Sequence, residues 1–424
     1  MEPILLNTDD TGRVRQDESP DRASHRQTTR DLKPWLQVLV GFLVNFMTWG
    51  NPNSYGVYQL YYSDTTDWSS SQISWIGSIQ LFLTFVTGTI SGRFADAGYA
   101  RHCILLGSSL NVFGLMMTSI ARSYWQVILA QGVCVGIGGG MMAMPAAAAI
   151  GSHLRSRRAL AMCISGCGAG IGAIANASLV QYLIPVVGFP WAVRCCGFLS
   201  LVCAVGANIL SRPPLYTRKT GGLIDWSAFQ SPFFIIFCIN SFATAVLDLP
   251  PSSSVQFLLI SNAASLLARP LSGLIADRHF GEVNTWNMLC VLLSGMIYAW
   301  IGIKNRQTMY MYSTLMGFVN GGAQGLFPSA INSLSMGSNK LGTRLGMVFG
   351  ICGVASLIGP PVMGAIIDGS GGNYLGAQLC GGTIMAMGSL TVATSRLFFS
   401  GGAGETSGWR PRLPMLRHSK PLTA

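Results

Sequence analysis

Twelve apolar stretches run through the 424-residue sequence, and they leave little room for any fold that is not helical and embedded in a membrane. Each is long enough, or nearly so, to cross a hydrocarbon core about 30 Å thick as a helix of about 20 residues. The stretches cover residues 35–61, 72–92, 102–121, 125–149, 159–182, 188–210, 232–247, 255–275, 285–303, 308–330, 343–367 and 373–398.

The scarcity of charge supports the same fold class. Charged residues make up 10% of the chain, against about 25% in soluble domains, which is too little to cover a surface that faces water. This composition argues against a soluble enzyme, a disordered protein and a secreted disulfide scaffold. The eleven cysteines lie almost entirely inside apolar stretches and show no metal-binding spacing, so we expect neither a metal nor a cofactor.

The net charge of +11 is distributed unevenly between the connectors of the apolar stretches. Connectors that follow even-numbered stretches contain Arg93, Arg101, Arg155, Arg157, Arg158, Arg212, Arg218, Lys219, Arg269 (at the end of a stretch), Arg278, Lys340 and Arg344. Odd-numbered connectors contain only Arg122, Lys304 and Arg306. By the positive-inside rule, the even connectors and both termini are expected in the cytoplasm. The positive charge therefore indicates orientation in a membrane, and no nucleic-acid partner is expected.

A short motif occurs twice, at equivalent positions of the two halves. The first copy contains Gly92, Asp96 and Gly98, with Arg101 following, and the second contains Gly273, Asp277, Arg278 and Gly281. The two Asp residues lie 181 positions apart, each after the second stretch of a six-stretch half. Glycine permits close helix approach, and an Asp/Arg pair can lock a short connector. We expect a conformational-switch role for Gly92, Asp96, Arg101, Gly273, Asp277, Arg278 and Gly281.

This repeat divides the expected all-α membrane fold into two pseudo-symmetric six-helix bundles. The expected segments are a disordered cytoplasmic tail at 1–34, a first bundle at 35–210, a cytoplasmic linker at 211–231, a second bundle at 232–398, and a cytoplasmic tail at 399–424.

The repeated motif resembles the loop signature of the major facilitator superfamily, whose members have twelve helices in two bundles. Within that superfamily the chain is similar to the fungal branch of the monocarboxylate-transporter-like family. The similarity is carried by residues 35–58, by Arg157-Arg158-Ala159-Leu160-Ala161, by Arg269-Pro270-Leu271-Ser272-Gly273, and by Leu341-Gly342-Thr343-Arg344-Leu345-Gly346-Met347.

The chain also departs from this family's pattern. Ala97 stands where the motif usually has a basic residue, and the second copy has one extra residue before Gly281. Animal members place a Lys near the position of Asn53 and an Asp at that of Ser265; both are associated with proton coupling. Their absence argues against lactate-type proton symport and favours a divergent substrate.

Arg269 is the main charge inside an apolar stretch. A guanidinium in the membrane is costly unless it is paired or hydrated, so we expect it to face the bundle interior. There it could pair with a substrate carboxylate. The alternative is a structural role, either in a packing ion pair or reaching to the headgroups.

Neutral amides form the second group of candidates. Such groups at membrane depth either hydrogen-bond across helices or line a watery cavity, and the sequence leaves both open. A break in the first stretch at Gly50-Asn51-Pro52 is a plausible hinge. These substrate-binding or cavity-lining candidates are Asn45, Asn51, Asn53, Asn320 and Gln324.

The seventh stretch is unusually short. From Ser231 to Asp277 there are 46 residues, whereas the equivalent interval from Trp35 to Asp96 has 61. Either the seventh span and its outer loop are truly shortened, or the gene model has lost a segment; we favour the second explanation.

The sequence therefore predicts a secondary transporter and not an enzyme. The expected substrate is a small organic anion or related metabolite, moved by alternating access, with efflux of a secondary metabolite favoured. The alternatives are a carboxylate or vitamin uptake permease and a non-transporting sensor or inactive carrier. The plasma membrane is the expected location, the expected state is a monomer in the lipid bilayer, and a coupling proton is left open.

Overall fold

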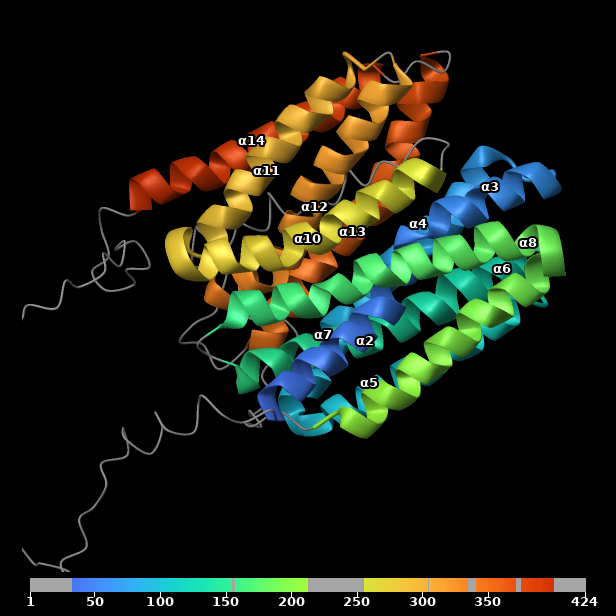
Figure 1. Cartoon of the computed structure of the whole chain (residues 1–424), viewed down its shortest axis with the longest axis horizontal. Helices are drawn as coiled ribbons and strands as arrows, with labels where there is room; N and C mark the ends of the chain where they lie inside the picture. Colours follow the sequence, from blue (N-terminus) through green and yellow to red (C-terminus); the bar gives the residue numbers. More distant parts are fainter. Residues whose placement is uncertain are drawn as a thin grey trace, which may run out of the picture.

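A computed structural model describes residues 33–154, 157–212, 255–303, 305–334, 341–370 and 375–399 of the chain, and the regular elements within them are all helices (Figure 1). The first half contains α2 (Lys33–Asn53), α3 (Tyr55–Thr65), α4 (Ser70–Phe94), η1 (Ala95–Tyr99), α5 (Ala100–Thr118), α6 (Tyr124–Val127), η2 (Ile128–Cys134), α7 (Val135–His153) and α8 (Arg158–Leu210). The second half contains α10 (Val255–Ile275), η4 (Ala276–Phe280), α11 (Glu282–Trp300), α12 (Arg306–Leu334), α13 (Leu341–Gly369) and α14 (Leu375–Phe399).

Five helical runs in the described residues are long and apolar enough to cross a membrane: Gln72–Thr118, Tyr124–His153, Arg158–Leu210, Gln256–Phe280 and Leu375–Thr394. The first and third contain 47 and 53 residues, or about 70 and 80 Å of helix, which is too long for one crossing. Each contains a glycine with positive φ, Gly98 at 93° and Gly188 at 80°. The expected stretches 159–182 and 188–210 thus both fall within α8, on either side of Gly188.

Several expected segments lie outside the described residues. These include stretch 232–247 with its proposed shortening, residues 1–32 of the N-terminal tail, 213–231 of the linker and 400–424 of the C-terminal tail. The first stretch, 35–61, is divided between α2 and α3, which meet at Ser54 just after Pro52. This break lies where the Gly50-Asn51-Pro52 sequence predicted a weak point.

The helices form two groups, which Figure 1 shows as blue-to-green and yellow-to-red ribbons. The most extensive packing in the first group is between α2 and α8, and in the second group between α10 and α12. Glycines make this contact close: a Cβ at Gly168 of α8 would lie 2.0 Å from the carbonyl oxygen of Phe42 in α2. Small residues at helix contacts are how membrane helices gain packing without a hydrophobic driving force.

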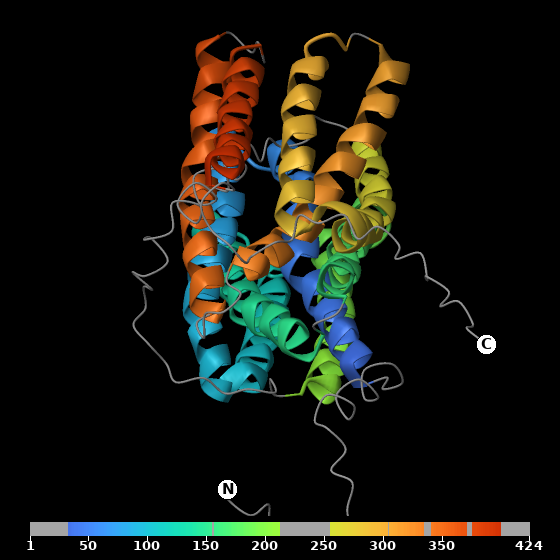
Figure 2. The same ribbon diagram turned by 90° about the vertical axis from the view of Figure 1, so that its left-hand side faces the viewer.

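The two groups meet along two seams. α4 packs on α13, and α8 packs on α10; Figure 2 shows both pairs side by side. In the α4–α13 seam, Thr89 Oγ1 donates a hydrogen bond of 2.6 Å to the carbonyl oxygen of Gly346. One hydrophobic cluster contains buried residues of both groups, such as Phe85 and Cys163 from the first and Leu326 from the second.

A row of aromatic rings crosses the α4–α13 seam. The ring centroids of Trp49 and Phe85 are 5.4 Å apart, as are those of Phe85 and Phe349. The row continues from Phe349 to Phe327 at 5.4 Å and from Phe327 to Trp286 at 5.9 Å. We call these five side chains the ring row; its Phe85–Phe349 contact joins the two groups.

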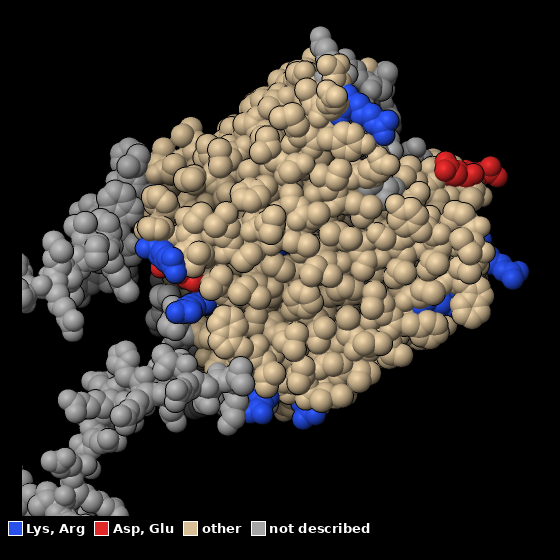
Figure 3. All heavy atoms as spheres, viewed as in Figure 1, with Lys and Arg blue, Asp and Glu red and all other residues tan. Residues whose placement is uncertain are grey.

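In the view of Figure 3 the exposed charged side chains lie at the ends of the helices, and the broad surface between them is uncharged. One end carries many arginines of the described residues, and we call it the basic end. Its arginines are Arg93, Arg101, Arg157, Arg158, Arg212, Arg278 and Arg344.

Candidate functional site

Arg269 lies inside α10, between the two groups of helices. The residue is only 4% exposed, which agrees with the expectation that it faces the interior. Its Nη1 donates to the carbonyl oxygen of Gly166 in α8, and its Nη2 donates to Gln324 Oε1 in α12 at 3.0 Å. The guanidinium thus bridges a helix of the first group and a helix of the second.

Two of the predicted amides extend this contact. Gln324 Nε2 lies 3.5 Å from Asn320 Oδ1, at the limit of a hydrogen bond. Arg269, Gln324 and Asn320 therefore form one connected polar row, which we call the arginine row. Gln324 is exposed and Asn320 is half-buried, so the row runs from a buried cation to an accessible amide.

Glycines leave the space that the guanidinium occupies. A Cβ at Gly166 would lie 3.1 Å from Arg269 Nη1, and one at Gly325 would lie 3.2 Å from Arg269 Cγ. The buried Nε of Arg269 has no hydrogen-bond partner among the described residues. A carboxylate that displaced the amide oxygen of Gln324 from Nη2 would replace a neutral acceptor with a charged one, which makes a stronger and shorter hydrogen bond.

The asparagines of the first stretch lie elsewhere. Asn45 Nδ2 donates to Gly41 in its own helix at 2.8 Å, and the residue is half-buried, as is Asn53. Asn51 is 5% exposed and accepts a hydrogen bond of 2.9 Å from Asn176 in α8. The contacts of Asn51 are those of an interhelical link, and none of these three asparagines is hydrogen-bonded to the arginine row in the structure.

The two copies of the repeated motif fold alike. Asp96 lies in η1 and Asp277 in η4, both five-residue π-helical turns that follow a long helix. Gly98 and Gly281 adopt positive φ, at 93° and 78°. Of the remaining predicted residues, Gly92 is buried, whereas Arg101 and Arg278 are exposed at the basic end.

The second copy contacts the first group directly. Asp277 Oδ2 accepts a hydrogen bond of 3.0 Å from the backbone N–H of Leu160, in the first turns of α8. A Cβ at Gly273 would lie 2.9 Å from Leu160 Cα and 3.0 Å from the carbonyl oxygen of Ala159. A carboxylate at a helix start is favoured by the helix dipole and by the free N–H groups there. This contact closes the α8–α10 seam at the basic end.

Sequence reasoning did not identify the carboxylate that follows this motif. Glu282 opens α11, ahead of the expected span 285–303. Burial raises its pKa to about 7, and the Ser329 hydroxyl and the nearby Arg158 offset only part of that rise. The sequence signal was available, because a lone Glu directly after the motif stands out in a chain with so few acidic residues.

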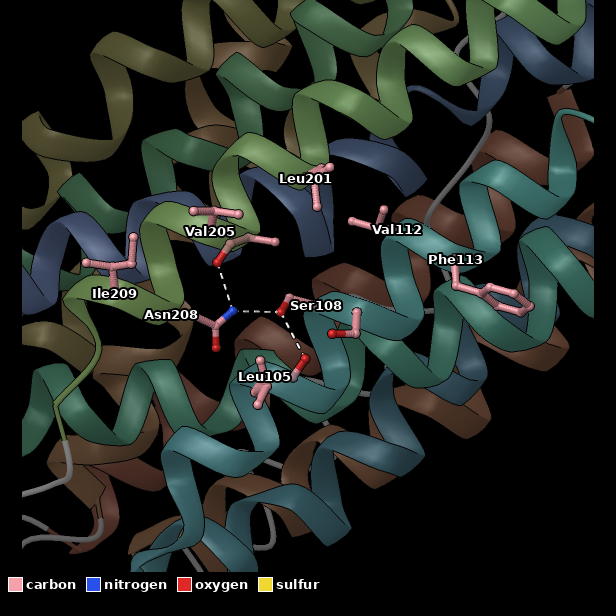
Figure 4. Close-up of a pocket in the computed structure, with 10 residues that line it drawn as sticks. Leu105, Ser108, Val112, Phe113, Leu201, Val205, Asn208 and Ile209 are labelled. Carbon is pink, nitrogen blue, oxygen red and sulfur yellow. Dashed lines mark hydrogen bonds between the residues drawn. The ribbon is translucent and has the colours of Figure 1, made fainter.

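A groove of about 490 Å³ lies between α5 and α8 and shares no residue with the arginine row. Figure 4 shows its mainly aliphatic walls, including Leu105, Leu201 and Val205. Asn208 Nδ2 donates to Ser108 Oγ at 3.0 Å and to the carbonyl oxygen of Ala204 at 2.8 Å, whereas its buried Oδ1 has no hydrogen-bond partner among the described residues. With no charged group in its lining, this groove is a poorer place than the arginine row for an anion.

Comparison with known proteins gives matches over most of the chain. A family model described as Major Facilitator Superfamily matches residues 38–360. An MFS-type transporter of Gibberella zeae is 32% identical over 381 residues, 86% of each chain. The MFS-type transporter dbaD of Emericella nidulans is 33% identical over 83% of each chain. The aspyridones efflux protein apdF of the same species is 30% identical over 88% of this chain and 80% of its own.

Proposed function

Because the chain belongs to the Major Facilitator Superfamily, we propose that it exports a small organic anion or related metabolite by rocking its two helix groups about the arginine row. The chain is an integral membrane protein and a transporter, not an enzyme. The observation that carries the proposed substrate class is the bridge from Arg269 to Gly166 and Gln324, which places a buried cation between the two groups.

The proposed architecture has twelve membrane spans in two six-helix bundles, at 35–210 and 232–398. The basic end faces the cytoplasm, together with both termini and the linker 211–231. This orientation rests on the excess of Lys and Arg in the even connectors. The proposed location is the plasma membrane, where an exporter removes its substrate from the cell.

The direction of transport rests on the relatives. The name of apdF states efflux, and we infer the same direction for this chain, which is 30% identical to apdF. The alternative, an uptake permease for carboxylates or vitamins, uses the same site and differs in the direction of net flux. A sensor or inactive carrier would keep the fold without flux.

The test is transport by the full chain in a fungal host that lacks its own anion exporters. Loaded aliphatic and aromatic monocarboxylates are followed by mass spectrometry inside and outside the cells. Wild type should lower the internal level of at least one acid. Arg269→Gln should abolish this export while Arg306→Gln, which removes an exposed arginine at the opposite end, should leave it intact.

Three results would count against parts of the proposal. Unchanged export by Arg269→Gln would remove Arg269 from the substrate site. Net accumulation of the acid by wild type would favour the uptake permease. No flux of any acid from correctly localised wild-type protein would favour the sensor or inactive carrier.

A further inference from the structure

A carboxylate and a guanidinium face each other across the closed basic end without a hydrogen bond between them. Glu282 Oε2 in α11 and Arg158 Nε in α8 are both buried, and neither atom has a hydrogen-bond partner among the described residues. The two residues belong to different groups of helices. A buried polar atom without a hydrogen-bond partner costs free energy, so these two atoms destabilise the arrangement in which they are buried.

The surroundings of Glu282 contain few other charges. Arg158 faces it from α8, and Asp277 faces it from η4; the hydroxyls of Ser329 and Ser333 lie close to it on α12. Asp277 opposes a negative charge on Glu282, whereas the Ser329 hydroxyl and Arg158 favour one. Since Asp277 also holds the N–H of Leu160, all the charges of this cluster lie at the contact that closes the basic end.

Buried apolar residues border this cluster. Ala159 and Cys163 of α8 belong to the same buried cluster as Val283 of α11 and Ala276. The Glu282 side chain as a whole is half-buried. It can therefore exchange a proton with water at the basic end, while its shielded Oε2 is held in a low-dielectric contact between the two groups.

We propose that Glu282 is a proton-binding site that controls the closure of the basic end. In the closed arrangement a proton from water binds the carboxylate and removes its shielded negative charge. When the two groups separate, Arg158 leaves with α8, the carboxylate becomes hydrated, and the proton returns to water. This inference rests on the proposed alternating access, because it requires a state in which the basic end is open.

The direction of the pH effect follows from the two states. Burial in the closed arrangement raises the pKa of Glu282 to about 7, whereas a hydrated Glu titrates near its usual value of about 4.3. The closed arrangement therefore binds the proton more tightly, and protonation favours closure. The contribution of protonation to closure is complete below the pKa of the open state. It is lost as pH rises through about 7, and the ratio of closed to open protein falls by up to about tenfold per pH unit.

The test measures the opening directly and needs no substrate. Spin labels on His102→Cys and His279→Cys report the distance between the two groups, because both residues are exposed at the basic end, one in each group. The full chain is placed in lipid nanodiscs between pH 5 and 9. Wild type should show a short-distance population that falls as pH rises through about 7.

Three variants discriminate the roles. Glu282→Gln, which mimics the protonated side chain, should keep the short distance at every pH. Arg158→Gln removes the cation that favours the carboxylate, so its transition should move to higher pH. Asp64→Asn removes an exposed carboxylate at the opposite end and should match wild type.

A wild-type transition that survives in Glu282→Gln would overturn the proposal. If that variant does not fold, the shift in Arg158→Gln carries the test, and an unshifted transition there would overturn it as well. The infrared band of a protonated carboxyl should appear in wild type below pH 7. These readouts contain no transport step. Unchanged export by Arg269→Gln would count against the proposed substrate site but would not alter the interpretation of these readouts.

Discussion

The two copies of the repeated motif share a π-helical turn but differ in the conformation of their glycine and in their neighbours. Each consists of a π-helical turn with one Asp and a glycine of positive φ. The first lies beside α13 and the second beside α8. The second is followed by the half-buried Glu282, which lies near Arg158, whereas the residue after Gly98 is the exposed Tyr99.

Because their neighbours differ, the two copies can contribute differently to the two seams between the groups of helices. The α4–α13 seam is held by the Thr89 hydrogen bond and by the ring row, neither of which titrates near neutral pH. The α8–α10 seam is closed at the basic end by Asp277, with Glu282 and Arg158 beside it, so under the proposal above this seam responds to protons. One seam therefore acts as a constant contact and the other as a conditional one.

The largest expected effect comes from adding a side chain at Gly273, where backbone packs against backbone in the conditional seam. A Cβ at Gly273 would meet backbone atoms of α8 at 2.9 and 3.0 Å, so Gly273→Ala should cost about 1–3 kcal/mol of closure. This corresponds to an increase of about fivefold to 150-fold in the open population, measured by the same spin labels. Gly295→Ala, where no atom lies within 4 Å of the added Cβ, is the matched control.

Gly346→Ala tests whether the other seam behaves in the same way. The added Cβ would lie 2.8 Å from Thr89 Cα. An effect similar to that of Gly273→Ala would show that the two seams contribute equally to closure. Wild-type distances in Gly346→Ala would show that closure depends on the conditional seam alone.

The glycines of the two copies should differ in their tolerance of a side chain. Gly281 combines φ 78° with ψ 160°, a region that is essentially restricted to glycine, so Gly281→Ala should cost about 2 kcal/mol. Gly98 has φ 93° and ψ 0°, which is less forbidding, and Gly98→Ala should cost about 1 kcal/mol. Thermal unfolding in nanodiscs compares the two, and equal losses would contradict the asymmetry.

Asp277→Ala should weaken closure by about 1 kcal/mol, or about fivefold, because it removes the acceptor of the Leu160 N–H. The carboxylate is exposed, so solvent replaces part of the lost bond. Asp277→Asn retains an acceptor and should lose less than Asp277→Ala. An Asn variant as open as the Ala variant in the spin-label distances would mean that the charge matters and the hydrogen bond does not.

The smallest effect is expected for Thr89→Val. This change removes the hydroxyl that donates to Gly346 but keeps the shape, at a cost of about 0.5–1 kcal/mol. Its effect on the label distance should be independent of pH, in contrast to that of Arg158→Gln. Thr383→Val is the control, because the Thr383 hydroxyl is exposed and bonds only within its own helix.

The sequence predicted the features that depend on the order and type of neighbouring residues. Apolar length and charge scarcity predicted the all-α membrane fold, and the motifs carried the resemblance to the superfamily that the comparisons confirm. A cation in an apolar stretch pointed to Arg269, which is buried as expected. Its role in substrate binding stays a prediction, as do the twelve spans and the orientation.

The features that the sequence could not provide are pairings over long separations. The partner of Arg269 Nη1 is the carbonyl oxygen of Gly166, and because every residue has a carbonyl, no residue type points to it. Asn51 and Asn176 are 125 residues apart and meet only through the packing of α2 on α8. The sequence left interhelical links and cavity lining open for the amides, and the structure shows a link for Asn51.

The ring row has a mechanical consequence for a protein that rocks. Trp49 and Phe85 move with the first group, and Phe349, Phe327 and Trp286 move with the second. Rigid rotation of the groups therefore leaves three of the four ring contacts intact and parts only Phe85 from Phe349, which are 5.4 Å apart in this structure. Opening then exposes two phenylalanine faces at once in the middle of the row, while the tryptophan contacts at its two ends stay intact.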